Sequence, residues 1–108
     1  MDERLVEDVL ALVEQVPPGR VTTYGAIGDR LGRGPRIVGR VLSEYGGPVP
    51  WWRVVRADGS LPPSHQGVAV QEYLAEGTPM RAPGRIDIAR AFWQPGTSSS
   101  GAERSSDG

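Results

Sequence analysis

The sequence predicts a mostly helical α/β fold of the winged helix-turn-helix type. Apolar residues recur at helical spacing in three segments between residues 3 and 45, and a stretch rich in valine and tryptophan follows at residues 49–61. With 108 residues, of which 38% are hydrophobic, the chain is long enough for one domain and too short for two. We therefore expect one domain over residues 1–94 and a tail over residues 95–108.

The first predicted helix covers residues 3–16. Its apolar residues return every three or four positions, which places them on one face, and Pro17-Pro18-Gly19 ends the pattern. We expect this face to supply the core, through Leu5, Val9, Leu12, Val13 and Val16.

Two shorter helices are predicted next. Thr22 or Thr23 is a suitable N-cap for the first, which ends at the glycines of residues 32–34. Pro35 suits the first turn of the second, whose apolar stripe ends before Gly46. Two short helices joined by a glycine-containing turn, the second basic at its start, are typical of a helix-turn-helix.

The remaining segments predict a wing, a fourth helix and a tail. Residues 49–61 indicate a strand, an Asp-Gly turn and the start of a return strand, and residues 66–77 return to helical periodicity. Residues 84–93 fit either alternation or a turn. The polar segment from Pro95 lacks the apolar surface needed to offset its ordering entropy, so we expect it to be disordered.

Charge is unevenly distributed along the chain, although the net charge is only -1. Residues 19–56 hold seven arginines against two acidic residues, and acidic residues crowd the first helix. All twelve basic residues are arginine, which suits phosphate and base-edge contacts but also follows from genomic base composition. A local basic block is the pattern expected of a nucleic-acid-binding surface.

Several kinds of chemistry are excluded by composition. The sequence contains no cysteine and one histidine, which removes disulfides, thiolate ligands and a cysteine nucleophile and leaves too few ligands for zinc. No apolar run approaches the roughly 20 residues of a membrane span, and the first residues are acidic rather than a basic leader. We expect a cytoplasmic protein without cofactor, metal or membrane partner.

Three motifs, in order and spacing, resemble a known family: VTTYGAIG at residues 21–28, RIVGRVL at residues 36–42 and PWWRVV at residues 50–55. They are similar to the C-terminal domain of O6-alkylguanine-DNA alkyltransferases. In that family the third motif contains a cysteine that accepts the alkyl group and a histidine after it. Trp51 and Trp52 stand in these two positions here.

A tryptophan at the acceptor position resembles the alkyltransferase-like proteins. The resemblance implies binding of O6-alkylguanine in double-stranded DNA without alkyl transfer, and delivery of the site to nucleotide-excision repair proteins. Trp52 departs from the His or Gln that those proteins more often carry. Alkyl transfer needs a thiolate, which an indole does not replace at neutral pH, so we expect no catalytic residue. We also expect a monomer.

The resemblance implies roles in base flipping for two residues. Tyr24 matches a tyrosine that presses on the phosphate of the target nucleotide, and its alternative is a core aromatic residue of the second helix. Arg36 matches an arginine that fills the gap left by the flipped base, and its alternative is a phosphate contact at a helix start.

Two further residues of the third helix belong to the predicted DNA surface. Gly39 fits a close approach to the DNA backbone, because glycine inside a helix otherwise costs about 1 kcal/mol relative to alanine. Arg40 contacts phosphate or lies on a solvated face. The resemblance implies that this helix enters the minor groove, which suits a protein that finds lesions in any sequence.

The predicted lesion pocket follows the third helix, and its alternative is a pair of core tryptophans. Strand alternation predicts that one tryptophan faces the pocket and the other packs elsewhere, with Trp51 in the pocket by family position. The remaining assigned pocket residues are Val49, Pro50, Trp52, Arg53 and Ser64, where Arg53 either bonds backbone carbonyls or lies on the surface.

Three polar residues near the pocket have weaker assignments. Glu72 matches the glutamate that orients the histidine of active enzymes, or is an ordinary exposed helix residue. Gln66 is a further candidate for base contact, whereas His65 caps a helix or faces solvent. The favoured function is a damage sensor that flips the modified base. The alternatives are an ordinary winged-helix regulator that binds undamaged operator DNA, and an enzyme with a nucleophile other than cysteine.

Overall fold

The computed structural model describes residues 2–61, 63–82 and 85–95, without the side chains of residues 63–66. In it, the N-terminal helix packs across the next two helices. Helix α1 spans Glu3–Gln15, and the Asp2 side chain caps it by accepting a hydrogen bond of 3.0 Å from the Arg4 amide. Its apolar face is buried, as its spacing predicts. None of the helices in the described ranges is long and apolar enough to cross a membrane.

Helices α2 (Tyr24–Leu31) and α3 (Pro35–Tyr45) form the predicted helix-turn-helix. Thr23 is the N-cap of α2, because its hydroxyl accepts a hydrogen bond from the Ala26 amide. Gly32 ends α2 with a φ of 71°, a left-handed conformation that favours glycine. Pro35 occupies the first turn of α3, so the expected starts and ends of both helices are confirmed.

The segment after α3 differs from the predicted strand and hairpin. Residues Trp51–Arg53 form a 3-10 turn (η1), and only Val54–Val55 (β2) is extended. β2 pairs in parallel with Thr22–Thr23 (β1), not with a return strand. The amides of Trp51 and Arg53 donate to the carbonyls of Val49 and Pro50, so they complete local turns in place of a ladder.

A tight turn does follow β2, as the Asp-Gly pair predicts. The Gly59 amide donates to the Arg56 carbonyl, and Gly59 has a φ of 86°. A Cβ atom there would lie 2.3 Å from the carbonyl oxygen of Ile86, so glycine is required for packing as well. The chain continues into α4 (Pro63–Glu76), the fourth predicted helix.

The wing lies further along the chain than predicted. Met80–Ala82 (β3) and Arg85–Ile86 (β4) pair in an antiparallel hairpin, and a short helix α5 (Ile88–Ala91) follows. Residues 85–93, which fitted either alternation or a turn, therefore contain a short strand followed by a short helix. Pro95 is buried at the end of the described chain, and the predicted disordered tail lies, from residue 96, outside the described residues.

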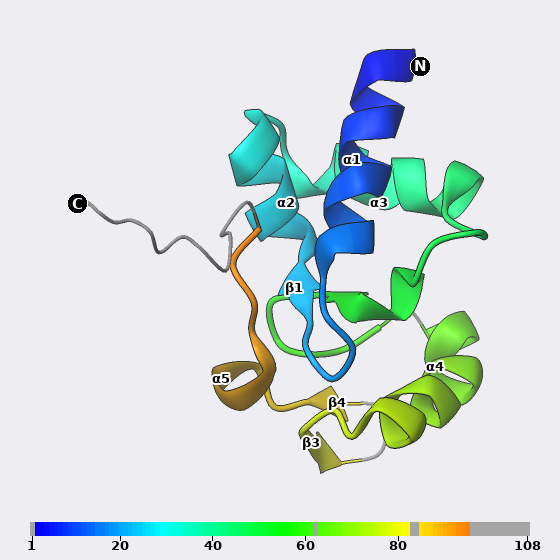
Figure 1. Cartoon of the computed structure of the whole chain (residues 1–108), viewed down its shortest axis with the longest axis vertical. Coiled ribbons are helices and arrows are strands. Elements are labelled where there is room, and N and C mark those ends of the chain that lie inside the picture. The colour runs from blue at the N-terminus through cyan, green and yellow to red at the C-terminus, as the bar shows by residue number, and fades with distance from the viewer. Residues whose placement is uncertain (1, 62, 83–84, 96–108) are drawn as a thin grey trace.

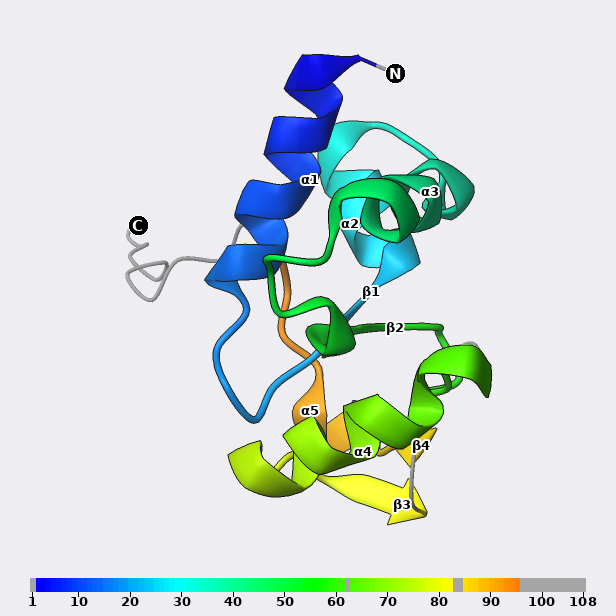
Figure 2. The same ribbon diagram turned by 90° about the vertical axis from the view of Figure 1, so that its right-hand side faces the viewer.

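Two apolar clusters form the core. The first lies among α1, α2 and α3, and the second joins the β-strands to α4 and α5. Val54 belongs to the first cluster and Val55 to the second, because successive residues of a strand face opposite sides. Figures 1 and 2 show the helix-turn-helix above and α4 with the hairpin below, with β1 and β2 between them.

Candidate nucleic-acid interface

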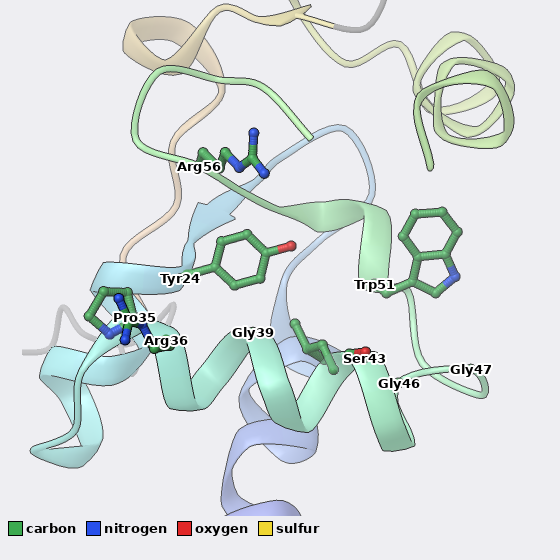
Figure 3. Close-up of a pocket in the computed structure, with 10 residues that line it drawn as sticks. Tyr24, Pro35, Arg36, Gly39, Ser43, Gly46, Gly47, Trp51 and Arg56 are labelled. Carbon is green, nitrogen blue, oxygen red and sulfur yellow. The ribbon is translucent and has the colours of Figure 1, made fainter. Parts of the chain in front are cut away.

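A groove of about 1040 Å³ runs along one face of α3. Figure 3 shows α3 as its floor, with Tyr24, Trp51 and Arg56 above it on other segments. Its lining contains two cations and no carboxylate among the described residues. The lining residues are Tyr24, Pro35, Arg36, Gly39, Leu42, Ser43, Gly46, Gly47, Trp51 and Arg56.

The floor of the groove comes from helical spacing. Arg36, Gly39 and Ser43 recur at intervals of three and four, so they lie on the same face of α3. A Cβ atom on Gly39 would meet only Tyr24 Cδ1, at 4.0 Å, an ordinary van der Waals distance. Protein packing therefore does not require glycine at this position. Its absent side chain instead keeps the floor low.

The start of α3 is electropositive. The N-cap residue Gly34 offers no side chain to cap the helix, and Arg36 lies in the first turn, exposed. The helix dipole and the guanidinium therefore add at this end of the groove.

Tyr24 lies beside α3 and is half-buried. Burial raises the pKa of its hydroxyl, and the nearby charge of Arg56 lowers it by less, so the net pKa is above its ordinary value. The hydroxyl stays protonated at neutral pH and is a hydrogen-bond donor. The ring of Tyr24 packs against the first core cluster, and the residue also lines the groove.

Trp51 and Trp52 point to different surroundings although η1 is not a strand. Trp51 lines the groove, whereas the Trp52 indole nitrogen donates a 3.1 Å hydrogen bond to Glu76 at the end of α4. The two rings meet edge to face, with centroids 5.7 Å apart.

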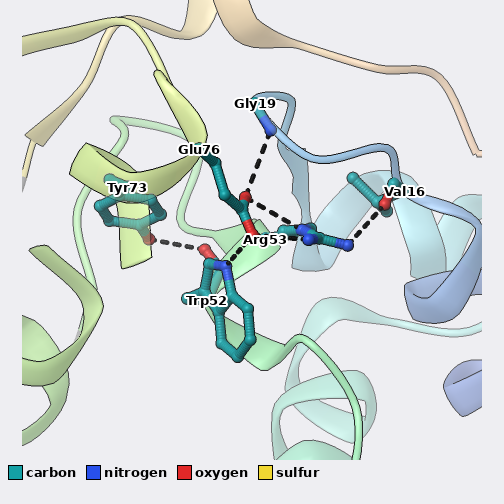
Figure 4. A network of polar contacts seen from close by, with 6 residues as sticks. All are labelled: Val16, Gly19, Trp52, Arg53, Tyr73 and Glu76. Atoms are coloured by element: carbon teal, nitrogen blue, oxygen red, sulfur yellow. Dashed lines mark hydrogen bonds and ion pairs between the residues drawn. The ribbon is translucent and has the colours of Figure 1, made fainter. Parts of the chain in front are cut away.

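A polar network behind Trp51 fixes η1 to α4 and to the loop after α1 (Figure 4). Arg53 Nη2 and Nε lie 2.5 Å and 3.1 Å from the two carboxylate oxygens of Glu76, and Arg53 Nη1 donates to the Val16 carbonyl. The Gly19 amide also donates to Glu76, and the Tyr73 hydroxyl donates to the Trp52 carbonyl. The side chains of Arg53 and Glu76 are only 14% and 12% exposed.

This network sets the charge of Glu76. Burial raises the pKa of Glu76, but hydrogen bonds from Arg53, the Gly19 amide and Trp52 outweigh burial and lower the pKa below its ordinary value. The carboxylate is therefore ionised and fully engaged at neutral pH. Burial raises the pKa of Tyr73 far above its ordinary value, so this hydroxyl is a permanent donor.

The structure brings together only part of the predicted site. Tyr24, Arg36, Gly39 and Trp51 share the groove. Arg40 does not line the groove; its side chain is 69% exposed and pairs with Glu44, one turn further along α3. The four other pocket assignments do not line the groove: Val49 is buried in the first core cluster, Pro50 precedes η1, and Trp52 and Arg53 belong to the Glu76 network.

The glutamate assignment needs correction. Glu76, one helical turn beyond Glu72, contacts the residue in the histidine position. Three predicted side chains, those of Ser64, His65 and Gln66, lie outside the described side chains.

Six lining residues escaped the sequence interpretation: Pro35, Leu42, Ser43, Gly46, Gly47 and Arg56. Leu42 and Ser43 were detectable, because they follow Gly39 at intervals of three and four on a predicted helix. Arg56 was not, since only the long-range pairing of β1 with β2 brings it beside Tyr24.

Comparison with known proteins identifies the family. The model of the 6-O-methylguanine DNA methyltransferase DNA-binding domain matches residues 4–77. A DNA base-flipping protein of Vibrio parahaemolyticus is 33% identical over 101 residues, which cover 88% of this chain and 100% of that protein. The DNA base-flipping protein of Escherichia coli is 34% identical over 98 residues, which cover 85% of this chain and 76% of that protein.

The fold is shared with a solved structure. The crystal structure of S. pombe Atl1 in complex with damaged DNA containing O6-carboxymethylguanine matches with a TM-score of 0.76 and 21% identity, over 88% of this chain and 99% of that one. This likeness confirms the predicted fold class. The chain thus belongs to the family of the 6-O-methylguanine DNA methyltransferase DNA-binding domain, and within it to the alkyltransferase-like proteins.

Proposed function

We propose that this protein is a non-catalytic sensor of O6-alkylguanine in double-stranded DNA. It flips the modified base into the groove and holds it against Trp51. The observation that carries the proposal is that Trp51, in the position of the family's acceptor cysteine, faces the same groove as Tyr24, Arg36 and Gly39. Relatives named DNA base-flipping proteins and a fold shared with a protein bound to damaged DNA support it.

Trp51 makes the groove a place to bind an alkylated purine rather than to repair it. Its indole offers a flat apolar face for stacking and contains no thiolate to attack the alkyl carbon. The chain has no cysteine elsewhere to take over that attack. Trp52 is engaged with Glu76 through its indole nitrogen, so neither partner supplies the general base that a nucleophile needs.

Tyr24 and Arg36 have distinct tasks in flipping. The protonated hydroxyl of Tyr24 donates to a phosphate and favours rotation of the nucleotide. Arg36, exposed at the start of α3, inserts its planar guanidinium in the gap left by the base. The low floor at Gly39 lets α3 approach the minor groove closely, and Arg40, which pairs with Glu44 outside the groove lining, is left with at most an outer phosphate contact.

The bound complex would then be a signal rather than a product. One copy of this chain holds the flipped, unrepaired base, and the distorted DNA is recognised by nucleotide-excision repair proteins. These events take place in the cytoplasm. This step rests on the resemblance to alkyltransferase-like proteins.

The test is fluorescence anisotropy of one duplex with and without a single O6-methylguanine, at fixed salt, followed by mass spectrometry of the recovered DNA. The proposal predicts tighter binding to the lesion, with the methyl group retained. Equal affinity for both duplexes would favour the alternative function, a winged-helix regulator that binds undamaged DNA. Loss of the methyl group would establish an enzyme instead.

A further inference from the structure

Arg56 lies beside Tyr24 because of the parallel strand pair. Thr22 is in register with Val54 and Thr23 with Val55. Tyr24 and Arg56 are therefore the residues that directly follow the two paired strands. The charge of Arg56 acts on the Tyr24 hydroxyl, as expected for neighbours. Figure 3 shows both side chains above α3, on the same side of the groove.

The backbone of Arg56 is held firmly. Its amide donates to the Ser60 carbonyl at 2.9 Å, and its carbonyl accepts from the Gly59 amide at 2.8 Å. The Ile86 amide donates to the Gly59 carbonyl at 2.9 Å and thereby ties this turn to β4. The backbone at Arg56 is therefore already ordered, so DNA binding has no further backbone freedom to remove there.

The Arg56 guanidinium has no ion pair in the described part of the chain. The nearest acidic residue in sequence, Asp58, accepts hydrogen bonds from the Ser60 amide and hydroxyl and pairs with Arg85 at 3.4 Å. Arg53, by contrast, is neutralised by Glu76. Arg56 is therefore an exposed cation over a groove whose described lining contains no carboxylate.

We propose that Arg56 and the Tyr24 hydroxyl together bind one phosphodiester group of the DNA strand that carries the flipped nucleotide. The site rests on the proposed function and deepens it by naming a second phosphate ligand. A guanidinium fork and a phenol hydroxyl are both donors, and they complement the unesterified oxygens of one phosphate. The contact contains no base edge, so it contributes affinity and orientation without selecting for the lesion.

The first experiment measures binding of R56Q to duplexes with and without O6-methylguanine over a range of salt concentrations. We expect about tenfold weaker binding to both duplexes and a salt slope smaller by about one, because one phosphate contact is lost. R56K keeps the charge and recovers part of the affinity. R4Q, on the distant α1, changes net charge equally and serves as the control, with affinities within about twofold of the wild type.

The second experiment locates the phosphate. Duplexes that carry one uncharged methylphosphonate linkage are compared, with the linkage moved along the lesion strand. Wild-type protein is expected to lose about tenfold in affinity at one linkage beside the lesion, and R56Q is expected to lose clearly less there, because only the uncharged Tyr24 hydroxyl still contacts that phosphate. Unchanged affinity of R56Q, or equal additional losses at every linkage, would overturn the proposal. Weakening confined to the lesion duplex would also overturn it, because Arg56 would then contact the adduct.

These outcomes separate the phosphate site from the sensor function. If the wild type shows no lesion preference but R56Q and one methylphosphonate remain coupled, the phosphate site stands and the sensor function fails. If lesion preference is present without that coupling, the sensor function stands and the phosphate site fails.

Discussion

Replacing Glu76 by glutamine removes the charge that Arg53 faces while it preserves the length of the side chain. The two side chains are 12% and 14% exposed, so an uncompensated guanidinium would remain in a mostly dehydrated place. Breaking a fully buried pair costs about 3–5 kcal/mol. The amide oxygen of glutamine still accepts from one or two of the donors, so we expect E76Q to lose about 2–3 kcal/mol of unfolding free energy.

The loss depends on pH with a defined sign. The folded-state pKa of Glu76 is lowered, so its contribution to stability is fully present above the pKa of the unfolded chain, about 4.3, and is lost as pH falls through the folded-state value. The wild type is therefore expected to lose its advantage over E76Q as the pH is lowered below the unfolded-state pKa and through the lower folded-state pKa of Glu76.

The assay is urea denaturation followed by tryptophan fluorescence at several pH values. The matched control is E44Q, because the Arg40–Glu44 pair is 69% and 45% exposed and contributes at most about 0.5 kcal/mol. Equal, small losses in both variants would refute the assignment of the Glu76 network as the support of η1. A gap between wild type and E76Q that does not change with pH would refute the assignment of charge to Glu76.

Three further predictions concern the groove. Y24A and R36A are each expected to weaken binding to an O6-methylguanine duplex by about 1–3 kcal/mol in anisotropy titrations, and unchanged affinities would remove both flipping roles. W51C is expected not to transfer a methyl group, because Trp52 occupies the histidine position and its indole is no base; methylated protein in a mass spectrum would contradict this. G39A is expected to raise unfolding free energy by up to about 1 kcal/mol, since its Cβ meets only ordinary contacts, while DNA binding weakens; unaltered binding would show that the floor need not be low.

Local sequence signals accounted for the helices. Apolar periodicity predicted the two helices of the helix-turn-helix, and Thr23, Pro35 and Gly32 marked where they start and end. These signals are readable from sequence because caps and breakers act within one or two helical turns. The β1–β2 ladder was missed because it joins segments about thirty residues apart and is two residues long, too short for a visible alternation. The valine-rich run after Pro50 was mistaken for a hairpin because its strand pairs with a distant partner.

The site was predictable only where family motifs or helical spacing applied. Tyr24, Arg36, Gly39 and Trp51 carry motif positions and do meet at the groove. Adjacent motif residues diverge, because the 3-10 turn aims Trp52 and Arg53 at α4 instead of the groove. On α4 the glutamate that contacts the histidine position is Glu76, one turn beyond the predicted Glu72. Only the packing of α4 against η1 shows which of the two it is.

The most direct test of the central claim, that Trp51 distinguishes the lesion, is the ratio of affinities for lesion and undamaged duplexes in the wild type and in W51A. Stacking on an aromatic side chain contributes about 1–3 kcal/mol per base, so the wild-type ratio should fall by about fivefold to about 150-fold in W51A while affinity for undamaged DNA is kept. A ratio that W51A leaves unchanged, or a ratio near one in the wild type, would contradict the account.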